Sequence, residues 1–313
     1  MDSQEGEKTH IGRRLRERCK MSETLTIALL GVGLMGAPYA RHLVEDGHTV
    51  RLYNRTRSKA EAIEGAQAFD TPEEAAQGSD VVITLLADDR AVLTEVTESV
   101  LAALSSDGTH LSCSTISVET TLELARRAQS AGCDHLSCPF LGRPDVVAKR
   151  AHQFLCSGQA KRREAMVDLL RSTSSGVIDF GESVEAAVTT KIATNSMIAT
   201  AITAMSETFA LLEKSGIDKE KAFSLWTASL FNCPLYKLYG RAILDGDHDD
   251  PRFLLRLALK DVTLMRDATE AAGTSHELVK AVRGEFEKSV QSGDGDLDFT
   301  GISRRIRQES GLP

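Results

Sequence analysis

Residues 26–36 read TIALLGVGLMG, an apolar run that passes into three glycines spaced as GxGxxG. Thr26–Leu30 is a short, continuous apolar run of the kind that forms a buried strand in a parallel sheet. Leu34–Asp46 carries apolar residues at helical spacing, and Gly47 follows as a residue suited to a helix C-terminus. The stretch therefore predicts a strand, a tight turn and a helix in immediate succession.

Each glycine of this turn has a mechanical reason. Gly31 makes the tight turn, Gly33 lets the backbone approach a pyrophosphate, and Gly36 lets the helix and strand pack closely. The helix N-terminus, next to Leu34 and Met35, adds unpaired N–H groups and a positive dipole for an anion. These five residues are predicted to bind a dinucleotide; the alternative is a purely structural glycine turn.

The end of the next predicted strand, at Tyr53, bears on which dinucleotide is bound. A chain that binds NAD usually carries an Asp or Glu here for the ribose 2′-hydroxyl, whereas this one reads Asn54-Arg55-Thr56-Arg57. Asn, Arg and Thr can donate hydrogen bonds to a 2′-phosphate, and Arg can pair with its charge. We therefore expect NADP(H) as the cofactor, held by Asn54, Arg55 and Thr56. The alternative is that Arg55 and Arg57 are solvated surface charges.

Around this unit, short apolar runs alternate with amphipathic stretches, which indicates βαβ units around a parallel sheet. The expected strands are Leu25–Leu30, Thr49–Tyr53, Val81–Leu85, Thr109–Ser112, Cys133–Cys138, Gln153–Cys156 and Gly176–Phe180. The expected helices between them include Leu34–Asp46, Val118–Ala131 and Lys161–Arg171. Residues 25–182 are thus predicted to form an α/β, Rossmann-type NADP-binding domain.

The strand signals stop after Gly181, so residues 183–313 are predicted to form an all-helical domain for substrate binding and dimerisation. Val184–Ser215 runs without Gly or Pro and with apolar positions at helical spacing, so one long helix is expected to join the two domains. Further helices are expected at Lys219–Ser229, Leu235–Leu244, Phe253–Ala272 and His276–Gln291. Residues 1–24 are expected to be a disordered tail.

The composition excludes several classes of protein. The 313 residues are 42% hydrophobic with a formal net charge of −8, so the basic surface that nucleic-acid binding requires is missing. No run reaches the ~18 uninterrupted apolar residues of a membrane helix, and residues 1–24 lack the apolar core of a secretory signal. The six cysteines form no CxxC pair, so we expect no metal site and no disulfide framework. We expect a soluble, cytoplasmic protein that binds neither nucleic acid nor membrane; the Arg-rich tail leaves a mitochondrial location open.

With these motifs in place, the sequence resembles the β-hydroxyacid dehydrogenase family, which includes 3-hydroxyisobutyrate dehydrogenases, tartronate semialdehyde reductases and glyoxylate/succinic semialdehyde reductases. The matching stretches are GVGLMGAPYARHLVEDGHTVRLYNRT at 31–56, CSTIS at 113–117, KIATN at 191–195, FLLRLALKD at 253–261 and LDFTGI at 297–302. The resemblance implies a dinucleotide-binding domain, a long connecting helix and a helical domain, assembled as a homodimer or homotetramer. It also implies an NADP-dependent enzyme that transfers hydride between nicotinamide and a small carbonyl or hydroxyl substrate, such as a 3-hydroxy acid or a semialdehyde.

Lys191 is the candidate for the proton transfer that this chemistry needs. Reducing a carbonyl with hydride requires a proton donor at the developing alkoxide, and the reverse oxidation requires a base. Lys191 matches the family's catalytic lysine, and Asn195, one helical turn later on the same face, resembles the residue that orients the substrate. Asp298 resembles a supporting position, or it caps a helix. Without the resemblance, Lys191 would be one of many solvated helix lysines.

Further site residues follow from the same resemblance. Lys260 stands in an apolar stretch and matches the lysine that the family places beside the nicotinamide, although it could instead extend to solvent. Ser114 and Thr115 follow a predicted strand end and match residues near the nicotinamide. We expect Thr115 to bind the cofactor and Ser114 to bind the substrate. Leu86 and Ala87 are expected to offer backbone contacts to the cofactor.

The segment SCPFLGRP at residues 137–144 departs from the family pattern. Most members carry Asp-Ala-Pro-Val-Ser-Gly-Gly here and hold the substrate carboxylate through the serine and backbone N–H groups. In this chain Leu141 replaces the serine and Arg143 the second glycine, while Gly142 remains. We expect these three residues to line the substrate site, with Arg143 either pairing with a carboxylate or facing solvent. Two alternatives stay open: C=N reduction, as in imine reductases, and a non-catalytic NADP-binding module. Both usually lack the catalytic lysine, which is retained here as Lys191.

Overall fold

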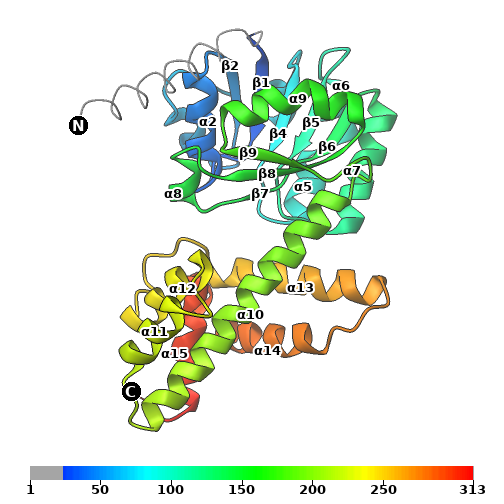
Figure 1. Cartoon of the computed structure of the whole chain (residues 1–313). Coiled ribbons are helices and arrows are strands. Elements are labelled where there is room, and N and C mark those ends of the chain that lie inside the picture. Colours follow the sequence, from blue (N-terminus) through cyan, green and yellow to red (C-terminus); the bar gives the residue numbers. More distant parts are fainter. Residues whose placement is uncertain (1–23, 313) are drawn as a thin grey trace, which may run out of the picture. The chain divides into compact units, whose positions relative to one another are not determined.

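The computed structural model describes residues 24–312, and the course of the chain can be followed in Figure 1. These residues form two compact units. Unit 1 comprises the chain up to Leu86 together with Arg90–Ser114 and Thr120–Ala187, and unit 2 comprises Ala87–Asp89, Thr115–Glu119 and the chain from Val188 onward. The tail predicted over residues 1–24 lies outside the described residues except for Thr24.

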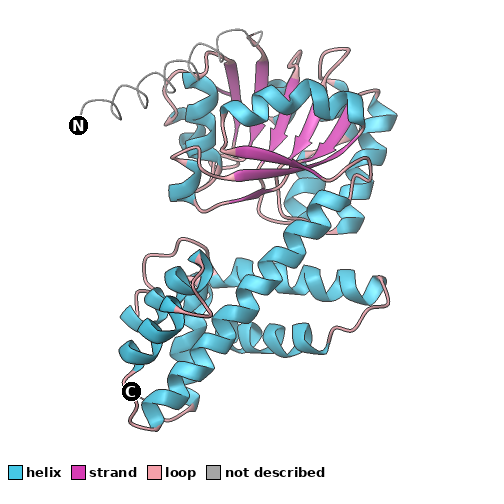
Figure 2. Ribbon diagram, viewed as in Figure 1, coloured by secondary structure: helices cyan, strands magenta, loops and turns pink. Residues whose placement is uncertain are grey.

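Unit 1 is built on one sheet, drawn in magenta in Figure 2. Its strands are β1 (Thr26–Leu30), β2 (Thr49–Tyr53), β3 (Gln67–Ala68), β4 (Val81–Thr84), β5 (Thr109–Ser112), β6 (Asp134–Ser137), β7 (Phe140–Leu141), β8 (Gln153–Gly158) and β9 (Gly176–Asp179). Their order is β3-β2-β1-β4-β5-β6-β8-β7, with β9 paired to β8. From β3 to β6 all pairs are parallel, with the strand order of a Rossmann-type fold. The predicted fold class is confirmed.

The middle of the sheet positions the predicted dinucleotide turn. β1 and β4 pair from Ile27 opposite Val81 to Leu30 opposite Thr84, and nearly every residue of the two strands is buried. A buried Val, Leu or Ile side chain contributes about 1.5–3 kcal/mol relative to an exposed one, so these strands are strongly held. The strand order reverses between β1 and β4, and open α/β sheets bind ligands at the carboxyl ends of the strands at such a point. The GxGxxG turn follows one of these ends and Leu86 follows the other.

The helices between the strands include several that the sequence pattern did not predict. Those of residues 24–185 are α2 (Gly36–Glu45), α3 (Arg57–Glu61), α4 (Pro72–Ala76), α5 (Asp89–Glu95), α6 (Glu98–Ala102), α7 (Val118–Ala131), α8 (Pro144–Val147) and α9 (Ala160–Ser172). α7 has the predicted boundaries. The unpredicted helices α3, α4, α5, α6 and α8 have four to seven residues, which is too short for a helical period to repeat.

One edge of the sheet departs from the all-parallel expectation. β8 pairs antiparallel with both β6 and β7, and the two-residue strand β7 was not predicted. The connection from β7 to β8, residues 142–152, contains only the four-residue helix α8. Antiparallel neighbours can be joined by short connections, whereas parallel neighbours need a crossover that is usually a full helix. The segment SCPFLGRP therefore lies at a reversal of the chain.

Unit 2 is helical, as the sequence predicted. Its elements are α10 (Ala186–Lys214), which begins just before the unit boundary, α11 (Lys219–Ala228), α12 (Pro234–Asp245), α13 (Leu255–Ala271), α14 (Glu277–Gln291), the 3₁₀ turns η1 (Asp294–Asp296) and η2 (Phe299–Gly301), and α15 (Ile302–Glu309). α10, α13 and α14 enclose a core that includes Phe209, Val262 and Phe286. None of the helices in the described part of the chain is long and apolar enough to span a membrane.

Candidate active site

The GxGxxG turn connects β1 to α2, and its three glycines have different surroundings. Gly31 has a φ of +110°, a left-handed conformation that favours glycine, and its N–H donates to the carbonyl oxygen of Tyr53 at 2.9 Å. A Cβ on Gly31 would overlap the carbonyl oxygen of Leu85, and a Cβ on Gly36 would overlap that of Gly31. Gly33 is exposed, and apart from its chain neighbours no heavy atom lies within 4 Å of the place its Cβ would take. The fold requires glycine at 31 and 36, whereas at 33 the space is open.

The helix end at this turn is suited to an anion. The first turn of α2 contains no acidic residue, so no side-chain charge there opposes an anion at the positive end of the helix. Leu34 is 61% exposed, which is unusual for a large apolar side chain, while Met35 packs partly against the core of unit 1. Open backbone N–H groups and an exposed apolar side chain fit the phosphates and the body of a dinucleotide.

Of the residues that follow β2, some hydrogen-bond to the neighbouring backbone and others are exposed. Asn54 accepts a hydrogen bond from the N–H of Val32 at 3.0 Å through Oδ1 and donates to the carbonyl oxygen of Thr56 at 2.9 Å through Nδ2, so its amide braces the turn. Thr56 precedes α3 without capping it. Arg55 is exposed and makes no hydrogen bond or ion pair with another residue of the described range 24–312. Arg57, which was not predicted to bind the cofactor, forms ion pairs with Glu61 and Asp70. Among residues 54–57, Arg55 is therefore the basic side chain without a hydrogen-bond or ion-pair partner in the range 24–312.

Ser114 is a structural brace between the ends of β4 and β5. Its Oγ accepts a hydrogen bond from the N–H of Leu86 at 2.8 Å and donates to the carbonyl oxygen of Thr84 at 3.3 Å. Only 3% of the residue is exposed. The hydroxyl of Ser114 was predicted to bind substrate and the backbone of Leu86 to contact the cofactor, but this hydroxyl and the N–H of Leu86 form a hydrogen bond with each other. The carbonyl oxygen of Leu86 remains for a ligand contact.

The segment 137–144 presents a mixed surface. Leu141 is half-buried in β7 opposite Gln153. Arg143 forms an ion pair with Asp145 at 3.1 Å, and its side chain is 18% exposed. A Cβ on Gly142 would lie 2.8 Å from the Cβ of His152, so glycine is required there by packing. The charge of Arg143 is already partly balanced within the loop.

Lys191 lies in the second turn of α10 and is buried, with 8% of the residue exposed. Burial lowers its pKa from 10.5 to about 8, because desolvation disfavours the charged amine. Two neighbouring charges are part of this net shift: the negative charge of Asp261 acts to raise the pKa of Lys191, and the positive charge of Lys260 acts to lower it. The lowered pKa makes the neutral amine of Lys191 more accessible near neutral pH than that of a solvated lysine.

Asn195 and the α13 residues Lys260 and Asp261 complete the surroundings of Lys191. Nδ2 of Asn195 donates to Oδ2 of Asp261 at 2.6 Å, and Nζ of Lys260 lies 2.9 Å from Oδ1 of the same carboxylate. Asp261 is 2% exposed. Lys260 also donates to the carbonyl oxygen of Thr115. We call Lys191, Asn195, Lys260 and Asp261 the lysine cluster; unit 2 alone brings its four residues together.

Thr115 and Ala87, both predicted to bind cofactor, also belong to unit 2. The segments that carry them are tied to each other, because the carboxylate of Asp89 accepts a hydrogen bond from the N–H of Ser117 at 2.8 Å. Thr115 reaches the lysine cluster through its carbonyl oxygen, which accepts from Lys260. The contact engages the backbone of Thr115 and leaves its side chain for a ligand.

Asp298 caps η2 and braces the start of α13. Its Oδ1 accepts from the N–H and hydroxyl of Thr300 at 3.1 and 2.7 Å, and its Oδ2 accepts from the N–H groups of Arg252 at 3.0 Å and Phe253 at 3.3 Å. Asp298 is 6% exposed. Asp298 is hydrogen-bonded to the beginning of the segment that leads to Lys260, so it supports the lysine cluster without belonging to it.

The sequence pattern gave no role to Asp261, the neighbour of Lys260. The available signal was a charged pair within the largely apolar stretch 257–264 of α13, because a buried carboxylate has to find a partner. The sequence spacing of His110 and His135 did not predict that these two histidines lie next to each other. Their Nδ1 atoms lie 3.0 Å apart, and burial lowers the pKa of both, to about 4 for His135. These histidines are neutral and serve the packing of the sheet.

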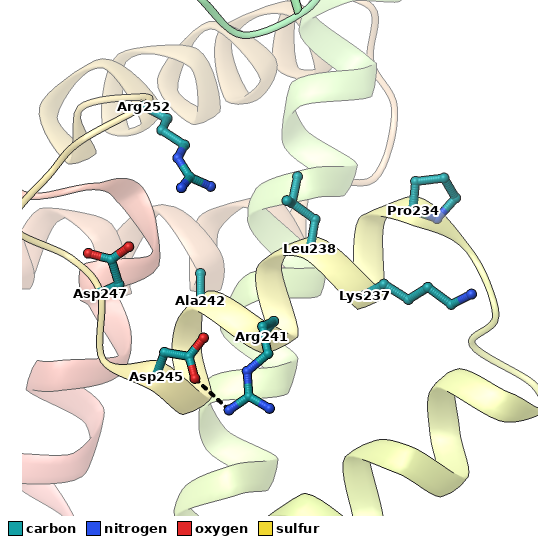
Figure 3. Close-up of a pocket in the computed structure, with 8 residues that line it drawn as sticks. All are labelled: Pro234, Lys237, Leu238, Arg241, Ala242, Asp245, Asp247 and Arg252. Carbon is teal, nitrogen blue, oxygen red and sulfur yellow. Dashed lines mark ion pairs between the residues drawn. The ribbon is translucent and has the colours of Figure 1, made fainter. Parts of the chain in front are cut away.

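Unit 2 also has a surface pocket of about 400 Å³ on α12 and the loop after it (Figure 3). Lys237, Arg241 and Arg252 line it together with Asp245 and Asp247. Arg241 pairs with Asp245 at 2.6 Å, so part of the charge is balanced within the pocket. None of the predicted site residues lines it, and we assign it no role.

Two family models and the relatives that are at least 30% identical identify the family of this chain. Residues 26–181 match the model described as the NAD binding domain of 6-phosphogluconate dehydrogenase. Residues 186–306 match the model described as the NAD-binding domain of NADP-dependent 3-hydroxyisobutyrate dehydrogenase. The two matches follow each other along the chain and together leave out little beyond residues 1–25.

Individual relatives cover nearly the whole chain. The "Uncharacterized oxidoreductase YfjR" of Bacillus subtilis (strain 168) is 37% identical over 287 residues, which is 90% of this chain and 100% of the relative. The "Probable 3-hydroxyisobutyrate dehydrogenase" of Mycobacterium tuberculosis (strain ATCC 25618 / H37Rv) is 30% identical over 291 residues, covering 90% of this chain and 98% of the relative. A solved structure of Mycobacterium tuberculosis 3-hydroxyisobutyrate dehydrogenase superimposes with a TM-score of 0.83 at 29% identity, covering 91% and 99% of the two chains. The chain therefore belongs to the β-hydroxyacid dehydrogenase family and is an NAD(P)-dependent oxidoreductase.

Proposed function

We propose that this protein transfers hydride between NADP(H) and a small carbonyl or hydroxyl substrate of the 3-hydroxy acid or semialdehyde type, with Lys191 moving the proton. The observation that carries the proposal is the buried amine of Lys191, whose pKa burial lowers to about 8. A proton donor or acceptor works best when its pKa lies near the working pH, because both protonation states are then accessible. The position of this lysine in the sequence is also that of the family's catalytic lysine.

The residues of the turn fit a dinucleotide. The open space at Gly33 and the α2 N-terminus without acidic residues can accept a pyrophosphate on backbone N–H groups. When bound, the nicotinamide supplies hydride to a carbonyl carbon, or accepts it from an alcohol carbon. Arg55, exposed and without a partner in residues 24–312, can pair with a 2′-phosphate and so favours NADP(H) over NAD(H).

In the direction of reduction, Lys191 acts as the acid. Negative charge develops on the substrate oxygen as its carbon gains hydride, and the ammonium of Lys191 gives its proton to that oxygen, which leaves the neutral amine and an alcohol. In oxidation the neutral amine removes the hydroxyl proton. Asn195, one turn away, holds the substrate oxygen in place through its side-chain amide.

The segment 137–144 favours one rival reaction, the reduction of a C=N bond. Leu141 stands where a serine hydroxyl would hold a carboxylate, and Arg143 is partly neutralised by Asp145. A more apolar pocket would suit an imine better than a hydroxy acid. Lys191 argues for the carbonyl substrate, because imine reductases generally lack the catalytic lysine that this position resembles.

A panel of substrates tests the proposal. Glyoxylate, succinic semialdehyde and a cyclic imine are offered with NADPH, and 3-hydroxyisobutyrate with NADP⁺, and the change in NADPH absorbance is recorded. Turnover of a carbonyl or hydroxy acid is expected to fall at least about 100-fold in Lys191→Ala, which is the low end of the range for general acid–base catalysis, with NADPH affinity unchanged. Lys214→Ala, at the exposed end of the same helix, is the matched control and keeps full turnover.

Three results would overturn the assignment. Turnover of the imine alone would replace the carbonyl substrate. Near-normal turnover in Lys191→Ala would remove that residue from the mechanism. NADPH binding without turnover of any substrate would favour a non-catalytic module. The homodimer or homotetramer implied by the family stays a prediction, which size-exclusion chromatography with light scattering checks.

A further inference from the structure

Asp261 is a buried carboxylate for which neither the sequence pattern nor the proposed chemistry provides a role. It lies on α13 next to Lys260 and is 2% exposed. Burying a charged carboxylate costs several kcal/mol unless partners satisfy it. Here Nδ2 of Asn195 donates a hydrogen bond to Oδ2 at 2.6 Å, and Nζ of Lys260 forms an ion pair with Oδ1 at 2.9 Å, while Oδ1 has no hydrogen-bond donor within the described residues 24–312. The carboxylate is therefore held between α13 and α10, at the place where the proposed proton transfer occurs.

The contact with Asp261 decides which way the amide of Asn195 faces. An ionised carboxylate can only accept hydrogen bonds, so the NH₂ group of Asn195 has to point at Asp261. The amide then presents its Oδ1, an acceptor, together with the remaining N–H to the other side. A substrate hydroxyl can donate to this Oδ1. If the amide could rotate freely, it could also turn by 180° and present its NH₂ group to the substrate in place of Oδ1.

The same carboxylate sets the charge balance around Lys191. The two charged groups that act on Lys191 are Asp261, which raises its pKa, and Lys260, which lowers it; both lie on α13. Lys191 itself is one helical turn from Asn195, on the face that meets Asp261. One negative charge is thus shared by two amines, and removing it would leave two ammonium groups without a counter-charge.

We propose that Asp261 is the positioning residue of the lysine cluster: its carboxylate fixes the orientation of the Asn195 amide, and its negative charge balances the positive charges of Lys260 and Lys191. This proposal rests on the proposed function of Lys191. Asp261 acts through Lys191 and Asn195 and does not itself exchange a proton with the substrate.

Two substitutions on neighbouring residues should move the pH profile in opposite directions. In the reduction, kcat is expected to fall as pH rises through the pKa of Lys191. Asp261→Asn keeps the shape of the side chain but removes its charge, so the midpoint moves down by about one pH unit, the low end of the range for an opposite charge in contact. Lys260→Met removes the repelling charge, so the midpoint moves up. In the double variant Asp261→Asn/Lys260→Met, the midpoint of the kcat–pH profile should return toward the wild-type value, even if kcat itself is changed.

A carboxylate on the same helix gives the matched control. Asp267 lies six residues after Asp261 and is paired with Arg266 on the surface, its side chain 51% exposed. Asp267→Asn should leave both the midpoint and kcat unchanged. If Asp261→Asn fails to fold, Lys260→Met still tests the charge balance. Midpoints that stay at the wild-type value in both variants, or that move in the same direction, would overturn the proposal.

A measurement without turnover separates this proposal from the proposed function. The ¹⁵Nζ resonance of Lys191 can be titrated by NMR, assigned by its disappearance in Lys191→Met. A midpoint that falls in Asp261→Asn supports the role of Asp261 even if no substrate is turned over. A wild-type protein that reduces substrates while the resonance titrates identically in Asp261→Asn would refute the positioning role and leave the proposed function standing.

Discussion

Replacing Gly33 and Gly36 by alanine, one at a time, should separate cofactor binding from folding. A Cβ on Gly36 would overlap the carbonyl oxygen of Gly31, and both atoms belong to a rigid backbone that cannot rotate away. A Cβ on Gly33 would enter open space, and Gly33 is not among the glycines with positive φ. Gly36→Ala is therefore expected to lose stability, and Gly33→Ala to keep its stability but lose affinity for NADPH.

The two magnitudes follow from these surroundings. Forcing an extra methyl group into a packed backbone costs about 1–3 kcal/mol, and for a chain of this size each kcal/mol lowers Tm by about 2–4 °C. Gly36→Ala should therefore melt about 2–12 °C below the wild type. Gly33→Ala gains about 0.4–1 kcal/mol from the unfolded state, so its Tm stays or rises slightly. Because its methyl group occupies the approach of the pyrophosphate, the Kd for NADPH should rise at least about tenfold, or about 1.4 kcal/mol.

Thermal melting without ligand and titration of NADPH fluorescence give the two readouts. Gly284→Ala, in the middle of α14 where no contact lies within 4 Å of a Cβ, is the matched control. It should raise Tm by a small amount and leave the Kd for NADPH unchanged. Wild-type affinity in Gly33→Ala would mean that the pyrophosphate does not lie over this residue. An unchanged Tm in Gly36→Ala would refute the argument from close backbone approach.

Three further outcomes are expected. Because the folded-state pKa of Lys191 is lowered from 10.5 to about 8, the charge of Lys191 opposes folding fully below pH 8 and progressively less up to pH 10.5. Lys191→Met should therefore raise the free energy of unfolding at pH 7 by up to about 3 kcal/mol, measured by urea titration. An unchanged free energy of unfolding would contradict the argument that the charge of Lys191 is buried. Arg55→Ala should raise the KM for NADPH about tenfold with little effect on NADH, since only NADPH carries the 2′-phosphate; equal effects on both cofactors would exclude this pairing. Burial lowers the pKa of His152 from 6.5 to about 4, so the contribution of the neutral imidazole to stability is complete above pH 6.5 and is lost as pH falls toward 4. His152→Phe should therefore reduce the drop in Tm between pH 7 and pH 5. An unchanged drop in Tm would show that groups other than His152 cause it.

The sequence pattern predicted the structure best at positions that a single residue type can occupy. The positive φ of Gly31 and the backbone contact at Gly36 follow from the GxGxxG spacing, because no other residue type fits these places. The continuous apolar runs of β1 and β4 also identified buried parallel strands, since a strand covered on both faces shows no polar alternation.

Short elements and strand direction escaped the sequence pattern for a physical reason. β3 and β7 have two residues each, so no period can repeat, and they depend on pairing with strands that are distant in sequence. The direction of β8 leaves no trace in its side chains, because a buried strand looks alike in both directions. Such features are decided by tertiary contacts rather than by local preference.

For the candidate site, the pattern named residues but not their contacts. Asn54 and Ser114 were expected to face ligands, yet their hydrogen-bonding groups largely satisfy the neighbouring backbone. Asp261 had no expected role, although it joins Asn195 to Lys260. A sequence states which groups can form hydrogen bonds, whereas the fold decides which of them are already used. The roles of these residues in catalysis remain predictions.

The reversal of the chain at β8 has a consequence for how this protein can change. Residues 138–152 form the two-residue edge strand β7 and the connection that leads from it to β8, while the parallel strands from β3 to β6 pair with one another without them. Within this stretch Val147 and Arg150 hydrogen-bond to His42 of α2, so mutations that reshape this edge of the sheet are best placed on β7, which pairs with β8. The exchange of a serine for Leu141 beside an intact GxGxxG turn is the outcome that such an arrangement permits, and libraries aimed at new substrates would best be confined to this stretch.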